Sequence, residues 1–129
     1  MNITKTNETN IEQKKFEEKK IVFICSPFAG DIEGNTERAR RYGRFAVIKN
    51  AIPIIPHLMY PQFLCEDDPE ERKLGLAMGL VLLSKCQELW VFGGKVTSGM
   101  AVEIDKAKSV NMPIRYFDIH CKPVGGMRG

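Results

Sequence analysis

The chain has 129 residues, of which 43% are hydrophobic and 27% charged, and its formal net charge is +3. This length suits one domain with a sizeable core, and the composition is that of a soluble globular protein. Acidic and basic residues are interleaved, which excludes a basic stripe for nucleic acid but leaves a phosphorylated small ligand compatible. We therefore expect a small-molecule partner and no nucleic acid.

Neither a membrane span nor a signal peptide is predicted. The longest near-apolar run, Leu74 to Ser84, is too short to cross a bilayer, and the polar N-terminus lacks the apolar core of a signal peptide. The cysteines are widely spaced, with no C-x-x-C pair, at Cys25, Cys65, Cys86 and Cys121. We expect free thiols in a reducing cytoplasm and no membrane association. His120-Cys121 has no second pair at ligand spacing, so we expect no metal and no cofactor.

Both ends of the chain read as tails outside the folded domain. Residues 1–19 are rich in Asn, Thr, Glu and Lys and almost free of large apolar side chains. Such a segment cannot bury enough surface to offset its ordering entropy, so we expect a disordered tail or a frayed helix there. The glycine-rich end predicts a flexible C-terminal tail over 120–129, which leaves one domain at 20–119.

Between the tails, short apolar runs alternate with helix-like segments. In chain order we predict a strand at 21–25, a helix at 35–50, a strand at 51–55, a helix at 69–85, a strand at 88–92, a helix from Thr97 or Ser98, and a strand at 113–117. Pro53 places the second strand at an edge, or marks its start. This order implies right-handed crossovers and a parallel sheet covered on both faces. The predicted class is α/β, a three-layer Rossmann-like (flavodoxin-like) sheet of four or five parallel strands with helices on both faces.

Unusual loops follow the first three predicted strands, at Ser26–Asp31, Pro56–Tyr60 and Gly93–Ser98. In an open parallel sheet, ligands bind outside the carboxyl ends of the strands, where the strand order reverses. The topology brings these loops to one edge of the sheet. We expect the binding site there.

The last predicted helix carries an inward stripe made of Met100, Glu103, Ile104, Ala107 and Val110. Glu103 is the only charged member of this stripe. One interpretation is a helix-flank carboxylate that is solvated or paired with Lys95 or Lys106. The other is a partly buried nucleophile or base, since a glutamate can attack an anomeric carbon and form a glycosyl ester.

The glycine-rich loop before that helix is a second candidate. Thr97 and Ser98 are ordinary N-cap residues, and Gly93, Gly94 and Gly99 permit tight turns. The same hydroxyl and backbone donors can also face a phosphate. The spacing matches neither a Walker loop nor a dinucleotide fingerprint.

Other residues near the expected edge have two interpretations each. Ser26 either ends its strand or points its hydroxyl into the cleft, together with the backbone N–H groups through Gly30. Arg38, one turn after Asn35, is either solvated or within reach of an anionic ligand. His57 is either a packed turn histidine or a proton donor near the cleft.

The helix predicted at 69–85 raises the question of assembly. Asp67 and Asp68 are interpreted first as caps of this helix, with a substrate role as the alternative. The helix is apolar nearly all round, which is more than one buried face requires. Part of it is expected to pack on another subunit in a homo-oligomer, a dimer or higher.

Several motifs together resemble a known group of proteins. The matching segments are Val22–Asp31, Asn35, Pro56–Leu58, Trp90–Gly93 and Ser98–Ile104, within roughly residues 20–117. They resemble a family of uncharacterised bacterial and phage proteins. That family is similar to the nucleoside 2-deoxyribosyltransferases and the 2'-deoxynucleoside 5'-phosphate N-hydrolases.

The resemblance implies a role for each matching residue. By resemblance, Glu103 attacks C1' of a deoxyribonucleoside, and the loop from Ser26 to Gly30 contacts the sugar or its 5' group. That loop includes Pro27 and Phe28, and the Gly93-to-Met100 segment lies beside the same ligand. A hydroxyl residue stands where the hydrolases bind the 5'-phosphate, so Thr97 and Ser98 favour a nucleotide over a nucleoside.

One departure from the transferases concerns the leaving base. They carry an aspartate at the end of the third strand, whereas this chain has Gly93 and Gly94 there. Protonation of the base would then come from His57 or Asp67. The expected function is cleavage or transfer at an N-glycosidic bond of a nucleotide or 2'-deoxynucleotide, and the alternative is a non-catalytic nucleotide-binding sensor or sequestering protein with the same cleft.

Overall fold

The computed structural model describes residues 3–125, with side chains from residue 8 onward. Four parallel strands form one sheet in the order β2-β1-β3-β4. The strands are β1 (Ile21–Cys25), β2 (Ile52–Ile54), β3 (Glu88–Phe92) and β4 (Ile114–Phe117). The helices are α1 (Ile3–Glu17), α2 (Ile32–Ile48), the short α3 (Pro56–Met59), the 3-10 turn η1 (Tyr60–Gln62), α4 (Pro69–Ser84) and α5 (Ser98–Ser109).

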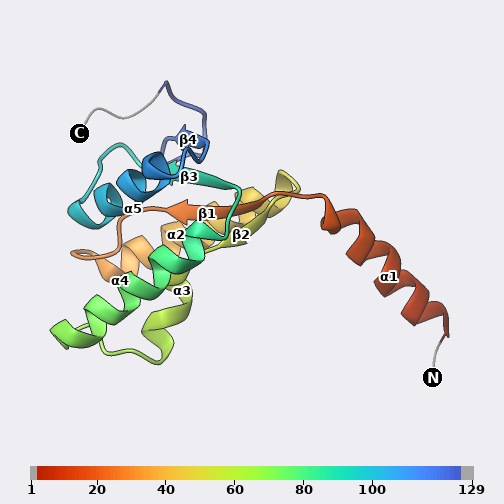
Figure 1. Ribbon diagram of the computed structural model, residues 1–129, viewed down its shortest axis with the longest axis horizontal. Helices are drawn as coiled ribbons and strands as arrows, with labels where there is room; N and C mark the ends of the chain where they lie inside the picture. Colours follow the sequence, from red (N-terminus) through yellow and green to blue (C-terminus); the bar gives the residue numbers. More distant parts are fainter. Residues whose placement is uncertain (1–2, 126–129) are drawn as a thin grey trace.

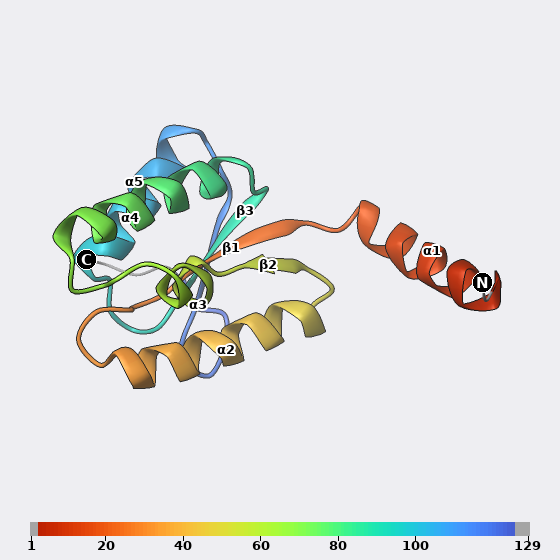
Figure 2. The ribbon, with the colours of Figure 1, turned by 90° about the horizontal axis from the view of Figure 1, so that it is seen from below.

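The sheet is the middle of three layers. Figure 2 shows α2 on one side of the sheet, with α4 and α5 together on the other. One core cluster joins Phe23 and Val91 to Leu83 of α4 and Ile104 of α5. A second cluster on the opposite face packs β1, β3 and β4 against Tyr42 and neighbouring residues of α2. This arrangement confirms the predicted three-layer α/β fold with four strands.

Strand burial follows position in the sheet. The central strands β1 and β3 are buried almost throughout, as expected of strands covered by helices on both faces. The edge strands β2 and β4 are partly exposed. Pro53 lies in β2, which is an edge strand, as predicted. At an edge, the backbone N–H that proline lacks is not needed for pairing inside the sheet.

Side-chain caps mark the starts of α2 and α4, as one also does for α5. Asp31 accepts a hydrogen bond from the backbone N–H of Gly34 at 3.1 Å, so α2 begins at Ile32, three residues before the predicted start at Asn35. The predicted start of α4 is confirmed, because the Asp68 carboxylate accepts from the N–H of Glu70 at 2.9 Å.

The N-terminal segment forms α1, where the sequence predicted a disordered tail or a frayed helix. Figure 1 shows α1 extending away from the sheet and its covering helices. Among the described side chains of α1, Phe16 is partly buried and the others are exposed. Within residues 3–125, no helix has the length and hydropathy needed to cross a bilayer.

The C-terminal segment differs from the flexible tail expected over 120–129. The Asp118 carboxylate accepts from the backbone N–H groups of His120 and Lys122 and closes a turn. The N–H of Val124 then donates to the carbonyl of Tyr116 at 3.0 Å. The domain therefore extends beyond the expected boundary at 119, because this turn pairs the chain with β4; residues 126–129 lie outside the described part.

Candidate active site

The loops after β1, β2 and β3 meet at the carboxyl end of β1. Since β1 lies between β2 and β3, the chain segments that follow the three strands are neighbours. The His57 ring donates from Nε2 to the carbonyl of Ser26 at 3.1 Å. A Cβ placed on Gly93 would lie 3.8 Å from Cδ of Pro27. The predicted gathering of these loops at one edge is confirmed.

The loop after β1 is held by α2 and α3. The Asn35 amide donates to the carbonyls of Phe28 and Ala29, at 3.0 and 3.2 Å. The Phe28 ring stacks on His57 with centroids 4.8 Å apart. Ser26 is buried, and its Oγ has no hydrogen-bond partner among the described residues. A buried hydroxyl without a partner is costly, so this oxygen is a natural contact for a ligand atom.

A hollow of about 180 Å³ opens at the same edge, on the α2 side of the sheet. Its lining residues are Pro27, Asn35, Arg38, Tyr42, Gly93, Gly94, Lys95 and Ile119. Arg38 is held by two acceptors, Oδ1 of Asn35 at 2.7 Å and the Asp31 carboxylate at 3.5 Å. Arg38 and Lys95 give the hollow two positive charges, which suit an anionic group.

Helical periodicity alone gives Tyr42 an inward, core position on α2, and the sequence indicates Lys95 only in one of two interpretations of Glu103, as its partner. Both line the hollow, although the Tyr42 ring also stacks on Phe92 at 4.3 Å. A signal was present for Tyr42, since it follows Asn35 and Arg38 at helical spacing and so shares their face of α2.

Gly93, the first of the two glycines after β3, has a backbone conformation that disfavours a carboxylate at its position. Its φ is +99°, which L side chains rarely adopt, and its N–H donates to the carbonyl of Phe117 at 3.1 Å. A Cβ at this position would make only an ordinary van der Waals contact, so the backbone angle is the constraint. An aspartate at this position would be strained.

Glu103 is buried on the inward face of α5, as the apolar stripe predicts. It is 5% exposed, and its Oε1 has no hydrogen-bond partner among the described residues. Neither Lys95 nor Lys106 forms an ion pair with it in the described part of the chain. Burial raises the pKa of Glu103 to about 7, and the neighbouring Cys25 thiol lowers this pKa by a smaller amount.

The residues just before Glu103 have three different surroundings: one caps α5, two are exposed, and one is in the core. Thr97 is the N-cap of α5, and its Oγ1 accepts from the N–H of Met100 at 3.2 Å. Ser98 and Gly99 are exposed. Met100, expected beside the ligand, instead packs in the core with Cys25, because its side chain points into the sheet.

The structure separates the two candidate proton donors. Burial lowers the pKa of His57, and the bond to Ser26 places the proton of a neutral ring on Nε2. Nδ1 of that ring is then an acceptor. Asp67 is exposed, and no hydrogen bond or ion pair among the described residues links it to Glu103 or Ser26. His57 therefore lies beside Ser26 in the candidate site, whereas Asp67 is exposed and is not linked to that site by a hydrogen bond or an ion pair among the described residues.

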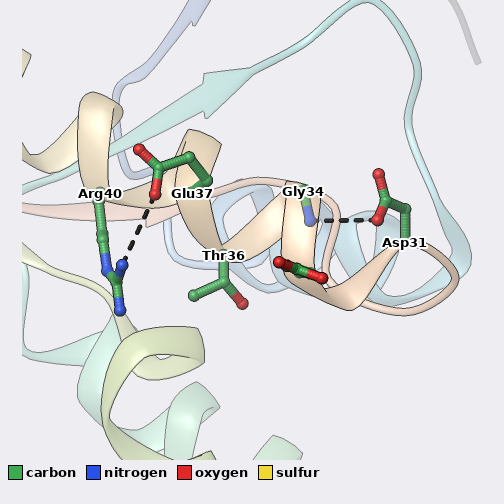
Figure 3. Close-up of a pocket in the computed structure, with 6 residues that line it drawn as sticks. Asp31, Gly34, Thr36, Glu37 and Arg40 are labelled. Carbon is green, nitrogen blue, oxygen red and sulfur yellow. Dashed lines mark hydrogen bonds and ion pairs between the residues drawn. The ribbon is translucent and has the colours of Figure 1, made fainter.

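A second, shallower hollow of about 550 Å³ lies along the N-terminal half of α2 (Figure 3). Its lining residues are Asp31, Glu33, Gly34, Thr36, Glu37 and Arg40, and most are exposed. Its Arg40 pairs with Glu37 at 3.6 Å. Within residues 3–125, no three His, Cys, Asp or Glu side chains are grouped as metal ligands would be. This hollow contains neither Glu103 nor Ser26.

Comparison with known proteins places the chain in a family. A family described as a domain of unknown function (DUF7768) matches residues 20–117, and the protein belongs to it. No curated protein matches the sequence significantly.

Solved structures add a likeness of fold. The 2-deoxyribosyltransferase of the psychrotolerant bacterium Bacillus psychrosaccharolyticus matches with a TM-score of 0.65, over 84% of this chain and 77% of that chain. Its sequence is 14% identical, so the likeness concerns the fold. It agrees with the resemblance to deoxyribosyltransferases that the motifs indicated.

The raised pKa of Glu103 predicts how stability changes with pH. The folded protein holds this proton more tightly than the unfolded chain, so the free energy of unfolding falls as pH rises from about 4.5 to about 7. Glu103→Gln removes this loss. We expect the Glu103→Gln variant to gain up to about 3 kcal/mol relative to wild type between pH 5 and pH 8, measured by urea unfolding.

His57 has a lowered pKa, so its contribution to the free energy of unfolding rises with pH. Because His57 is present in both proteins, the difference between their free energies of unfolding reports on Glu103. Glu33→Gln, at an exposed position in the first turn of α2, is the matched control. Its effect should change by less than about 0.5 kcal/mol over the same range. A constant difference between wild type and Glu103→Gln would contradict the assignment.

Proposed function

We propose that the protein cleaves or transfers the N-glycosidic bond of a nucleotide or 2'-deoxynucleotide, with Glu103 as the nucleophile. The observation that carries the proposal is the Glu103 carboxylate, which is buried and has neither a paired cation nor a hydrogen-bond partner for Oε1 among the described residues. The fold shared with a 2-deoxyribosyltransferase supports the same reaction class.

The reaction proceeds in two displacements. An ionised oxygen of Glu103 attacks C1', the C1'–N bond breaks, and the base leaves with the bonding electron pair and takes up one proton. Water or a second base then attacks C1' of the glycosyl ester and releases the carboxylate. Because the pKa of Glu103 is about 7, the reactive form is substantially populated at neutral pH.

The phosphate of the substrate would occupy the hollow beside Gly93. Arg38 and Lys95 supply charge there, and the glycines let backbone N–H groups approach an anion closely. Glu103 is on α5, which covers the face of the sheet that Cys25 of β1 packs against. Pro27, two residues after Cys25, borders the hollow on the α2 side. A bound nucleotide would therefore extend across the end of β1, past the unpaired Ser26 hydroxyl.

The proton on the leaving base has one candidate source within this site. His57 holds its Nε2 proton on the Ser26 carbonyl, so it donates to a base only after Nδ1 takes up a proton. This requirement favours mildly acidic conditions, whereas the nucleophile favours alkaline ones. We propose that the rate has a maximum between these two limits.

Removal of the nucleophile tests the proposal directly. Glu103→Ala is expected to reduce base release from nucleoside 5'-monophosphates by at least about 1,000-fold, because no other group forms the glycosyl ester. Free base is measured chromatographically across a panel of ribo- and deoxyribonucleotides. Glu33→Ala, at an exposed position, serves as the control and should retain wild-type rates.

The main rival is a nucleotide-binding sensor or sequestering protein without chemistry. The absence of an acid at Gly93 is the observation that favours it. Tight nucleotide binding by wild type, with no base released over the whole panel, would establish the rival and reject the enzyme.

The hollow predicts selectivity for a phosphorylated substrate. Arg38→Ala should raise KM for a 5'-monophosphate about 10- to 100-fold and leave the corresponding nucleoside nearly unaffected, since only the former loses a charged hydrogen bond. Arg44→Ala, exposed on the same helix, is the matched control. An equal rise in KM for nucleotide and nucleoside would contradict phosphate binding in this hollow.

Assembly through α4 is a separate proposal. Leu74, Leu76 and Val81 of this helix remain 49%, 40% and 57% exposed in the single chain. We propose that a second copy covers them, and that Val81→Glu lowers the mass measured by light scattering after gel filtration. Val47→Glu, 44% exposed on α2, should leave the mass unchanged. A wild-type protein with the mass of a single chain in this measurement would contradict the proposal.

A further inference from the structure

The hollow beside Gly93 offers hydrogen-bond donors, and none of its described lining residues is an Asp or a Glu. Both contacts of the Arg38 guanidinium, to Asn35 and to Asp31, use Nη2. Its Nη1 and Nε groups have no acceptor among the described residues, and Lys95 forms no ion pair there. The hollow therefore has donors that a bound anion could use.

Tyr42 borders this hollow with a ring that the core holds in place. The residue is 1% exposed, and its ring stacks on Phe92 with centroids 4.3 Å apart and planes 15° apart. Tyr42 follows Asn35 and Arg38 at helical spacing, so the three side chains share one face of α2. Stacking on Phe92 fixes the plane of the Tyr42 ring and, with it, the position of the hydroxyl.

The chain itself leaves the Tyr42 hydroxyl without a partner. No hydrogen bond among the described residues includes this oxygen, and the fully enclosed polar side-chain atoms without a partner are Ser26 Oγ and Glu103 Oε1. Tyr42 Oη is therefore not fully enclosed, and the hollow is the open space that Tyr42 borders. Burial raises the pKa of Tyr42, so the hydroxyl keeps its proton at neutral pH and can donate it.

We infer that Tyr42 is a specificity-determining residue of this hollow: its hydroxyl donates a hydrogen bond to a phosphoryl oxygen of a ligand held between Arg38 and Lys95. The identification of that ligand as a substrate rests on the proposed function. The binding of phosphate does not, and it is measurable without turnover.

A neutral donor suits a site that already contains two cations. A phosphate monoester carries a charge of about −1.5 to −2 at pH 7 and has three strong acceptor oxygens. Arg38 and Lys95 together match this charge, and Tyr42 adds a donor without adding a third positive charge. Because the Tyr42 ring is already held on Phe92, little freedom is lost when its hydroxyl binds a ligand.

Tyr42→Phe removes the hydroxyl and keeps the stacked ring. Since the hydroxyl has no partner in the ligand-free chain, the midpoint of urea unfolding should not fall. The dissociation constant of inorganic phosphate, measured by NMR titration of the Gly93 and Gly94 amides, should rise about 10-fold. An unchanged dissociation constant, or a wild-type protein that does not bind phosphate, overturns the inference. A lower unfolding midpoint would show that the hydroxyl has a structural role instead.

Two further variants control for changes elsewhere in the domain. Tyr116→Phe removes a hydroxyl from a residue that packs against the core cluster on the α4 and α5 side, so it should leave phosphate binding unchanged. Arg38→Ala removes a charge and should weaken phosphate binding more than Tyr42→Phe does. An equal loss in Tyr116→Phe, or no loss in Arg38→Ala, overturns the inference.

A second measurement uses the wild-type protein, in case Tyr42→Phe does not fold. The chain has three tyrosines, so labelling tyrosine with ¹³C at Cζ gives three NMR signals. The Tyr42 signal is the one that remains in both Tyr60→Phe and Tyr116→Phe. Inorganic phosphate should shift this signal and leave the other two in place. An unmoved Tyr42 signal, or an equal shift of all three, overturns the inference.

The outcomes also separate this inference from the proposed function. If Tyr42→Phe weakens phosphate binding but wild type releases no base, the hydrogen bond stands and the reaction is rejected. If wild type releases base, Tyr42→Phe should raise KM for a 5'-monophosphate about 10-fold and leave kcat nearly unchanged, because the hydroxyl contacts the phosphate and not C1'. Base release with an unchanged KM rejects the role of Tyr42 alone.

Discussion

The candidate site depends most on the burial of one carboxyl group, Glu103, which has no paired cation in the described part of the chain. A charged carboxylate removed from water is destabilised unless something compensates it, and here burial is the larger influence on the pKa of Glu103. The surrounding fold must stabilise the domain enough to hold this group in place. It does so by packing α5 beside α4 on one face of the sheet, with Met100, Ile104 and Ala107 of α5 buried in the core cluster of that face.

The strand order determines which residues can act together. Because β1 is central, the loop after it contacts the loops after β2 and β3. Side chains from both faces of the sheet can therefore approach the carboxyl end of β1. Cys25 points to the α5 side, toward Glu103, while Pro27 borders the cationic hollow on the α2 side. Under the proposed function, the bond cleavage and the anion binding would therefore occupy opposite faces of one strand end. Among the described residues, neither Arg38 nor Lys95 forms an ion pair with the Glu103 carboxylate.

Much of this could be predicted from the sequence. The apolar runs predict the buried strands, and the Asp68-Pro69 pair predicts where α4 begins. The apolar stripe on α5 predicts that Glu103 is buried. The hollow could not be predicted in the same way, because its wall depends on how α2 lies against the sheet. Tyr42 reads as a core residue from periodicity, and it does pack on Phe92, yet it also borders the hollow. The carboxyl-terminal turn was missed since it depends on one side chain, Asp118, bonding to backbone two and four residues later.

The lack of a cationic partner for Glu103 among the described residues matters for the proposed role of this carboxylate. A lysine or arginine paired with it would favour the ionised form strongly and would occupy an oxygen that the proposed reaction uses for attack. Burial instead raises the pKa of Glu103 to about 7. The carboxyl group therefore changes its charge near neutral pH, while Oε1 has no hydrogen-bond partner among the described residues.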